Sequence, residues 1–338
     1  MRSKRKSGGV YLTYAADLSG DGLGAQALRI MGIFSVACEL DFGYVHSPIQ
    51  SIEINPGDPH STKQERITYL RRVNRFFRLP SEVEDKPNIT RSFRSLTNRK
   101  ILWLRVINKV ARGLSLKVLI ESPSSLPWSD ENPNSYRWAS DIIAPRANSH
   151  GKSAATRLDI HIRRAVAPKV GRDGRAYDRY VPTEWYQEVL DVIVPFLHEK
   201  GLKCELRIHT DIPEGRWKVP EDTSPGTLAM WEFHNFIDAE GYLIDMSEDL
   251  GREFTQYGPV EIAQGWDPLD AIESMVEADV LILCASTFSY VAGLLRGDNL
   301  TISPYFFHRT PSSWSLASSD ILQGERELLL SQLKSQFG

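Results

Sequence analysis

The segment 279–284, DVLILC, constrains the fold of this 338-residue chain more than any other stretch. It is almost wholly apolar, which is typical of a strand buried on both faces at the centre of a parallel sheet. Strands are also expected at 156–162 and 203–209, and they alternate with amphipathic helices expected at 183–200 and 268–277. This alternation indicates an α/β domain with a doubly wound parallel sheet.

The first half begins with a second arrangement of the same kind. A strand is expected at 9–14, followed by the glycine-rich turn GDGLGAQ (20–26) and an apolar helix to about residue 40. Such a turn lets backbone amides approach an anion at the helix N-terminus, although a tight turn that merely begins a buried helix has the same pattern. A loop rich in Ser, Pro, Asn and Asp (122–151) predicts two domains, 1–150 and 151–338.

Composition places the chain among globular proteins with a sizeable core, with 41% hydrophobic and 25% charged residues. No apolar run approaches the roughly 20 residues that cross a bilayer. The basic start MRSKRKSGG is not followed by the apolar region of a secretory signal. Cys38, Cys204 and Cys284 lie far apart, with neither zinc-ligand nor disulfide spacing. A reduced, cytoplasmic protein is therefore expected.

Positive charge is concentrated in one segment. Residues 63–117 hold fifteen Lys or Arg and four Asp or Glu, a balance of +11 within a chain of net charge -3. Two basic amphipathic helices are expected there, at 63–78 and 100–112. They could meet a phosphorylated acceptor or the inner face of a membrane, or they could simply be solvated helix faces. The segment lacks the interleaved aromatic residues of single-strand nucleic-acid binders, so no nucleic-acid partner is expected.

The strand at 156–162 leads directly into two arginines. Leu158, Ile160 and Ile162 alternate with polar residues, so the strand delivers His161, Arg163 and Arg164 to its carboxyl end. Ligands of open parallel sheets bind at that end. Paired guanidinium groups suit a diphosphate, because each binds two oxygens and keeps its charge. In isolation, two arginines after a strand could equally well solvate a surface edge.

A third group of residues favours the same ligand. Ser286, Thr287 and Ser289 follow the buried strand at 279–284, at the start of an expected helix. Their hydroxyls and backbone amides could hold phosphate oxygens. Together with the arginines and the glycine-rich turn, they predict a nucleotide diphosphate bound between two Rossmann-like domains.

At these residues the chain resembles the fucosyltransferase superfamily of α-1,2-, α-1,6- and nodulation fucosyltransferases. The resemblance runs from about residue 20 to 295 and rests on GDGLGAQ, on HIRR (161–164) and on ADVLILCASTFSYVAGLL (278–295). It implies a GT-B fold of two facing Rossmann-like domains. It further implies an inverting, metal-independent transferase, with a GDP-sugar, most simply GDP-fucose, held by the C-terminal domain and the acceptor by the first.

The resemblance also implies roles for individual residues. Arg163 would hold the donor's β-phosphate, Arg164 would support it or pair structurally, and His161 would approach the nucleotide or the pyrophosphate. The other donor-binding residues are expected to be Ser286, Thr287 and Ser289 for phosphate, Asp270 for guanine, Gly22 and Gly24 from the first domain, and Asp211 at the end of strand 203–209.

The chain departs from the family where the general base is expected. Many members have Gly-Asp or Thr-Asp after HxRR, but Ala165 and Val166 stand there instead. The α-1,6 branch continues with Lys-Val-Gly and an acidic residue, which here is matched two positions later. This match nominates Asp173 as general base and Lys169 as its charge partner, with Asp178 and Asp211 as alternatives.

Two other functions compete with a glycosyltransferase. The missing acidic residue would suit a catalytically inactive nucleotide-sugar or glycan-binding protein on the same fold. A nicotinamide-dependent oxidoreductase is disfavoured, because the glycine spacing is GxGxG where dinucleotide binding needs GxGxxG. The acceptor is expected to be a glycan or a lipid-linked glycan.

Overall fold

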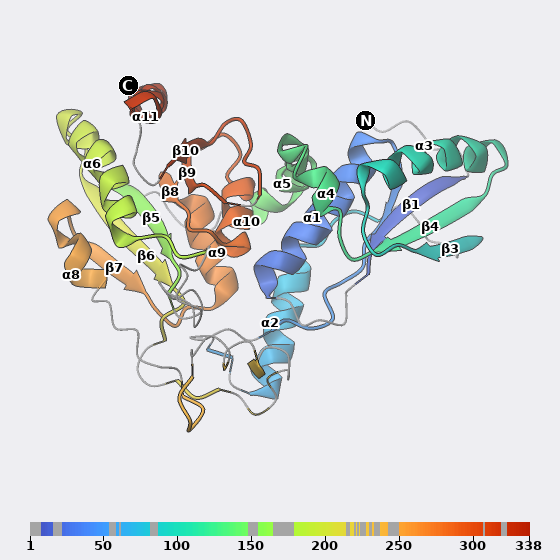
Figure 1. Cartoon of the computed structure of the whole chain (residues 1–338), viewed down its shortest axis with the longest axis horizontal. Helices are drawn as coiled ribbons and strands as arrows, with labels where there is room; N and C mark the ends of the chain where they lie inside the picture. The colour runs from blue at the N-terminus through green and yellow to red at the C-terminus, as the bar shows by residue number, and fades with distance from the viewer. Residues whose placement is uncertain are drawn as a thin grey trace. The chain divides into compact units, whose positions relative to one another are not determined.

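The computed structural model describes residues 8–15, 22–53, 59–60, 62–81, 87–147, 155–164, 179–213, 217–219, 221, 223, 228–229, 232, 237–242, 250–306, 308–318 and 323–338. The chain divides into two compact units. The first comprises 1–52 and 70–146, and the second comprises 53–69 and 147–338. Each unit is built on its own parallel sheet (Figure 1).

The first unit contains a four-stranded sheet in the order β2-β1-β4-β3, with all neighbours parallel. Its central strand β1 is buried along its whole length, as expected for a strand between two others. The elements of this unit are β1 (Gly9–Tyr14), α1 (Leu23–Glu39), β2 (Gly43–Val45), α2 (Lys63–Phe76, shared with the second unit), β3 (Ile89–Ser92), α3 (Asn98–Gly113), β4 (Lys117–Ser122), α4 (Leu126–Ser129), η1 (Pro133–Tyr136), α5 (Arg137–Ile143) and η2 (Ala144–Arg146).

A close contact positions α1 in this unit, and a helix cap and a buried hydrogen bond position α3. A side chain at Gly32 of α1 would place its Cβ 2.5 Å from the Oγ of Ser125, so any larger residue would force the α4 region or α1 to shift. Helix α3 begins at its N-cap Thr97, whose side chain accepts from the amide of Lys100. Its buried Asn108 accepts from the amide of Val10, which fixes α3 against β1.

The second unit contains a six-stranded parallel sheet in the order β10-β9-β8-β5-β6-β7. The buried strand predicted at 279–284 is β8, which lies between β9 and β5 as a central strand should. The elements are β5 (Thr156–Ile162), α6 (Thr183–Glu199), β6 (Cys204–Thr210), α8 (Leu250–Phe254), η3 (Thr255–Tyr257), β7 (Val260–Ala263), α9 (Pro268–Glu277), β8 (Val280–Ile282), α10 (Thr287–Leu295), β9 (Thr301–Pro304), β10 (Ser315–Ala317) and α11 (Gln323–Phe337).

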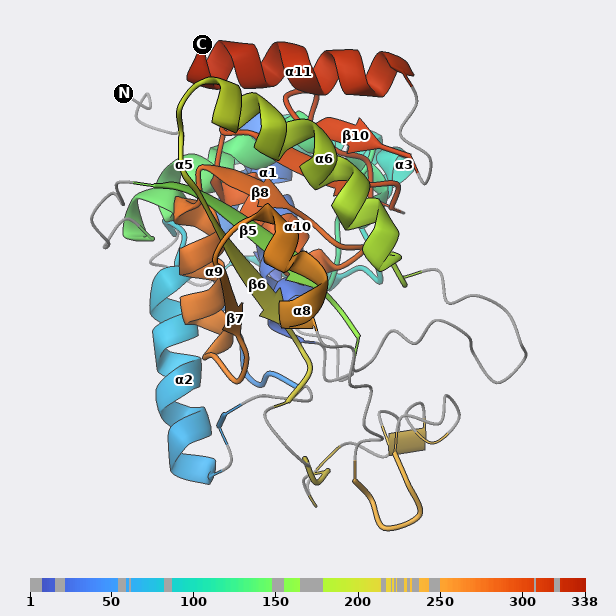
Figure 2. The ribbon, with the colours of Figure 1, turned by 90° about the vertical axis from the view of Figure 1, so that its left-hand side faces the viewer.

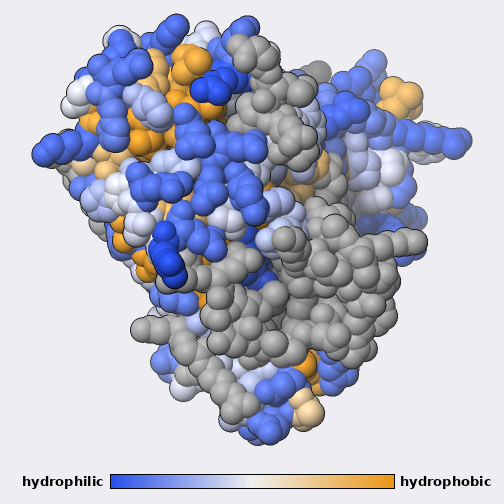
Figure 3. All heavy atoms as spheres, turned by 60° about the vertical axis from the view of Figure 1, so that its left-hand side comes forward, coloured by the Kyte–Doolittle hydropathy of each residue, from blue (hydrophilic) through white to orange (hydrophobic). Residues whose placement is uncertain are grey.

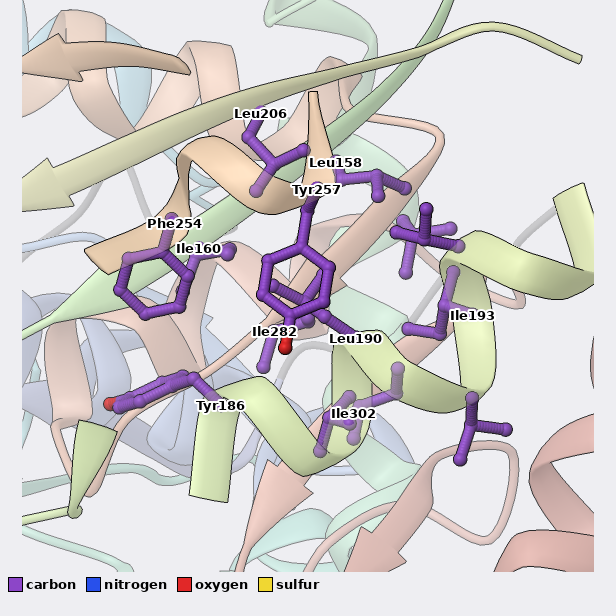
Figure 4. Packing of buried hydrophobic residues seen from close by; sticks show 14 of the residues in the cluster. Leu158, Ile160, Tyr186, Leu190, Ile193, Leu206, Phe254, Tyr257, Ile282 and Ile302 are labelled. Atoms are coloured by element: carbon purple, nitrogen blue, oxygen red, sulfur yellow. The ribbon is translucent and has the colours of Figure 1, made fainter. Parts of the chain in front are cut away.

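The two faces of this sheet differ in chemistry. On one face Leu158, Ile160 and Ile162 pack with side chains of α6 and α8, among them Tyr186 and Phe254 (Figure 4). Helix α11 lies against α6 and extends this core (Figure 2). Gly201, at φ 72°, follows the end of α6, where a left-handed residue favours glycine. On the opposite face the alternating residues of β5 are polar.

The predicted α/β class with two parallel sheets is confirmed, but two strands of the structure were not expected from the sequence. No strand was expected between the two basic helices, yet residues 89–92 form the edge strand β3. All four of its residues are exposed, so they carry no alternating apolar signal. Strand β10 was not predicted either. The apolar segment YLIDM (242–246) is also a candidate strand, but only Tyr242 lies within the described residues, where it forms an isolated antiparallel bridge with Lys218.

On the surface shown in Figure 3, hydrophilic residues predominate and apolar ones form smaller patches between them. No helix in the described ranges combines the length and the apolar character needed to cross a membrane. The assignment of donor and acceptor to the two units stays a prediction, as do the facing arrangement and the cytoplasmic location.

Candidate functional site

The topology of the second sheet places its switch point between β5 and β8. The chain starts at β5, continues through β6 and β7 on one side, and then returns to β8 and β9 on the other. Ligands of open α/β sheets bind outside the carboxyl ends of the strands at such a point. Arg163 follows β5 and Ser286 follows β8, so both predicted groups flank the switch point.

Beneath this point lies a buried polar network on one face of β5 and β6. Asp159 is fully buried, and its Oδ2 is 2.8 Å from Nε2 of His209 and 3.0 Å from Oγ of Ser274. Its Oδ1 accepts from Nε of Arg157 at 3.0 Å. Burial alone would raise the pKa of Asp159, but His209 and the guanidinium groups of Arg157 and Arg207 hold that pKa below its ordinary value. The carboxylate therefore stays charged and anchors β6 to β5.

His161 lies next to this network and is buried. Its Nδ1 is 3.0 Å from Sγ of Cys284, and its carbonyl accepts from the hydroxyl of Tyr186 at 3.1 Å. Its ring is also 5.5 Å from that of Phe288 in the first turn of α10. Burial, with the nearby His209 and Arg163, lowers the pKa of His161 to about 3. His161 is therefore neutral near pH 7, and it ties β5 to the turn after β8 without adding positive charge.

Arg163 is the arginine available to a ligand. Its side chain is 19% exposed, and its Nε lies 3.4 Å from Oδ2 of Asp211, which follows the neighbouring strand β6. The same carboxylate accepts from the amide of Arg164 at 2.7 Å through Oδ1. Asp211 thus orients Arg163 and the adjacent backbone. Within the part of the chain that the structure describes, the two terminal nitrogens of Arg163 have no hydrogen-bond partner.

Arg164 has a structural role. It is 1% exposed, and its Nη1 donates to the carbonyls of Arg163 (3.1 Å) and Val181 (3.0 Å). Its Nη2 donates to the hydroxyl of Thr183 at 2.9 Å, and its guanidinium lies over the ring of Tyr180 at 4.5 Å. Of the two roles left open for Arg164, structural pairing describes these contacts better than phosphate support.

The hydroxyls at the start of α10 also divide into groups bonded within the protein and a group available to a ligand. Ser286 is the N-cap and accepts from the amide of Phe288, while Ser289 is fully buried and donates to the carbonyl of Ser286. Thr287, the first residue of the helix, is partly exposed. Its hydroxyl has no partner among the residues described, and the helix N-terminus beside it carries a partial positive charge. Thr287 and the backbone amides are therefore the groups that this turn offers to an anion.

Asp270 lies elsewhere along the same edge of the sheet. It is in the first turn of α9, after β7, and β6 separates that strand from β5. The N-cap of this helix, Asp267, has its Oδ2 3.0 Å from Nε2 of His60. The ring of His60 in turn stacks on Tyr69 at 4.3 Å. The structure therefore gathers Arg163, Asp211 and the start of α10, but places Asp270 at the β7 side.

The remaining predicted residues belong to the first unit or lie outside the residues that the structure describes. Gly22 is the N-cap of α1 and Gly24 lies in its first turn, both in the first unit. Gln26 of the same motif donates to the carbonyl of Ser51 at 2.6 Å, so it has a local structural use. Lys169, Asp173 and Asp178 lie outside the described residues, and their roles stay predictions.

Sequence reasoning missed the partners that hold this site. The spacing of Cys284 indicates neither a zinc site nor a disulfide, and the structure shows that its thiol contacts His161 of the neighbouring strand β5. His209 was not singled out, although β5 and β6 pair it directly with His161. The alternating pattern of 203–209 could have placed His209 on one face of its strand. Only the pairing of that strand with β5 brings the two histidines together.

Comparison with known proteins gives distant structural likenesses. No family model matches the chain, and no curated protein matches it. One similar solved structure is POFUT1 in complex with GDP-fucose, at 12% identity and a TM-score of 0.41, over 93% of this chain and 98% of that one. Another is the E. coli heptosyltransferase WaaC with ADP, at 8% identity and a TM-score of 0.39, over 97% and 99%. A variant of FUT1 from Arabidopsis thaliana with GDP aligns at 12% identity and a TM-score of 0.36, over 90% and 72%. Scores of this size establish neither a donor nor an acceptor for this chain.

Proposed function

We propose that this protein is a glycosyltransferase that binds the diphosphate of a nucleotide-sugar donor between the carboxyl ends of β5 and β8. One observation carries the proposal: Arg163 and the start of α10 flank the switch point of the second sheet. Arg163 supplies fixed charge, while Thr287 and the helix N-terminus supply neutral donors. A diphosphate needs both kinds of group over a short span.

The chemistry follows from stabilising the leaving group. As an acceptor hydroxyl oxygen bonds to the anomeric carbon, the bond from that carbon to the diphosphate oxygen breaks. The departing nucleoside diphosphate keeps the electron pair. Arg163, oriented by Asp211, stabilises the negative charge that develops on that oxygen. A single displacement of this kind inverts the anomeric centre. The hydroxyl proton passes to a carboxylate, for which we nominate Asp173 with Lys169 as its charge partner.

The sequence motifs favour GDP-fucose as the donor and a glycan or lipid-linked glycan as the acceptor. We propose no metal requirement, since fixed cations and helix amides can take the place of a metal at the diphosphate. His161 and Ser289 support this site from within the protein, because both are buried and bonded to neighbouring groups.

Titration calorimetry tests the donor site. The full-length protein is titrated with GDP, UDP, ADP and GDP-fucose in the presence of a chelator. We expect GDP and GDP-fucose to bind more tightly than UDP or ADP. Arg163→Ala should weaken GDP binding by about 10- to 150-fold, because a charged hydrogen bond contributes roughly 1.5–3 kcal/mol.

Arg326→Ala is a matched control, because Arg326 is exposed on α11 of the same unit. It should bind GDP as the unaltered protein does. If no nucleotide binds, or if both variants lose affinity equally, this site assignment is wrong.

A catalytically inactive nucleotide-sugar-binding protein is the second candidate function. It is favoured by Ala165 and Val166, which stand where related sequences carry an acidic residue. Slow hydrolysis of radiolabelled GDP-fucose to free fucose and GDP would support an enzyme. GDP-fucose binding that depends on Arg163, with no hydrolysis and no transfer to any acceptor, would support the inactive binding protein.

A further inference from the structure

Helix α3 carries an apolar surface that no described residue covers. Five large apolar side chains on its outer side, the last at its C-cap, are more than half exposed, which is rare for residues of this kind in one short segment. We call them the α3 stripe: Leu102 (63%), Trp103 (69%), Val106 (62%), Val110 (56%) and Leu114 (64%).

The spacing of these residues makes them one continuous surface. At about 100° per residue, the stripe covers about 120° of the helix circumference. The opposite side of α3 is the one that packs in the first unit, through the buried Ile101, Leu104, Asn108 and Ala111. The core of the unit therefore does not use the stripe.

The charged residues of α3 itself are all positive, and of these Arg112 pairs with Asp41 on the side away from the stripe. Residues 98–114 contain five Arg or Lys and no Asp or Glu. Arg99, Arg105 and Lys109 are exposed, and none of them forms an ion pair within the described part of the chain. Long basic side chains can lay their stems along an apolar surface and keep their charges in a polar layer. An exposed Trp among Leu and Val, with basic neighbours, is typical of a helix that lies in a membrane interface.

Helix α2 shows that basic charge alone does not make such a surface. It is also rich in arginine, and Arg71 and Arg75 are exposed on it. Its large apolar residues Tyr69, Val73 and Phe76 are buried. The two basic helices expected from the sequence thus have different surfaces, and only α3 combines cations with an apolar stripe.

We propose that α3 binds the surface of an anionic lipid bilayer, with the α3 stripe among the lipid chains and Arg99, Arg105 and Lys109 at the headgroups. The charge complement favours lipid over a protein partner, because an anionic membrane offers negative charge and apolar depth in the same place. This inference rests on α3 alone and does not depend on the proposed donor site.

Vesicle flotation of the full-length protein tests the proposal. The vesicles are made of phosphatidylcholine alone or of phosphatidylcholine with phosphatidylglycerol. We expect binding to the anionic vesicles at low salt, weakened by added salt. Arg105→Gln with Lys109→Gln should weaken binding by about 25-fold, since each cation near an anionic surface contributes about 1 kcal/mol. Trp103→Ser should weaken it by roughly tenfold, through lost apolar burial.

The controls separate the stripe from general charge and general apolar exposure. Arg71→Gln with Arg75→Gln on α2 removes the same charge, and Leu328→Ser removes a 51% exposed apolar residue on α11. Both should bind vesicles as the unaltered protein does. The proposal fails if the unaltered protein does not float with anionic vesicles, or if the α2 pair reduces binding as much as the α3 pair.

Sedimentation velocity without lipid tests the alternative that a second copy of the chain packs on the α3 stripe. If the unaltered protein is dimeric and Trp103→Ser makes it monomeric, the α3 stripe is covered by a second copy of the chain, and the lipid proposal is wrong. A monomer in both cases agrees with it. Circular dichroism should show unaltered folding for each variant, because the altered side chains are exposed.

Discussion

Cys284 and His161 form a buried pair, and the protonation states of the thiol and the imidazole determine whether the pair is chemically reactive. Their Sγ and Nδ1 atoms are 3.0 Å apart, a distance at which a thiolate and an imidazolium could activate each other. Burial prevents this, because it raises the pKa of Cys284 to about 12 while that of His161 falls to about 3. Both groups are neutral near pH 7. The pair therefore joins β5 to the turn after β8, and Cys284 is not a nucleophile.

This neutrality predicts how stability depends on pH. The folded-state pKa of His161 is about 3, below its unfolded value of 6.5, so the unfolded chain takes up a proton that the folded chain cannot. The stability contributed by neutral His161 is fully present above pH 6.5 and is lost as pH falls below it. The expected loss is about 1.4 kcal/mol per pH unit between about pH 6 and pH 5.

Urea unfolding between pH 7 and pH 5, compared with His161→Asn, measures this contribution. The variant should be less stable at pH 7 but show a flatter decline in the free energy of unfolding as pH falls. His46, whose pKa burial lowers to about 4, adds its own slope equally to both proteins. Parallel declines in the two proteins would show that His161 is not the group responsible.

The elements around the site show which parts of a fold a sequence can specify alone. Helices α6 and α9 were predicted within a residue of their observed ends, because an apolar stripe and terminal residues such as Asp267 mark them locally. Strand β3 was missed because a fully exposed edge strand needs a partner to exist, and that partner is β4, 25 residues later. The order β8-β5-β6 is equally non-local, since it depends on crossovers through α6 and α9.

Non-local contacts also explain why the sequence did not distinguish the roles of Arg163 and Arg164. Their sequence predicted a matched pair for one diphosphate. Successive residues of an extended chain point to opposite sides, so Arg163 and Arg164 occupy different environments. Only the positions of Val181 and Thr183, where the chain enters α6, show that Arg164 is already held by hydrogen bonds within the protein.

Arg164 therefore acts between elements, holding the end of β5 to the start of α6. Arg164→Ala should lower the free energy of unfolding by about 3 kcal/mol or more, because it leaves buried carbonyl and hydroxyl partners unsatisfied. Arg163→Ala should lower it by less than about 1 kcal/mol, since its pair with Asp211 is partly exposed. Urea denaturation of both variants distinguishes these roles. Equal losses of stability would contradict the division between a structural and a ligand-binding arginine.

At the scale of the whole molecule, charge and ligand chemistry are divided between the units. The groups proposed to bind the donor diphosphate all belong to the second unit, whereas α3 and its exposed cations belong to the first. Each unit has its own parallel sheet and its own buried core. A ligand that contacts only the second unit should therefore stabilise that unit selectively.

Hydrogen exchange with and without GDP tests this division. At a GDP concentration about 100 times its Kd, the bound unit gains about 2.7 kcal/mol, so its most protected amides should exchange about 100-fold more slowly. We expect this slowing in β5, β6 and β8, and little change in β1 and β4. Arg163→Ala at the same GDP concentration should show none of this slowing.

Equal slowing in both sheets would mean that the two units unfold as one cooperative body. Local slowing confined to residues 22–26 of the first unit would instead support the predicted contact of Gly22 and Gly24 with the donor, because amides at the start of α1 can be protected by an anion without stabilising the sheet behind them.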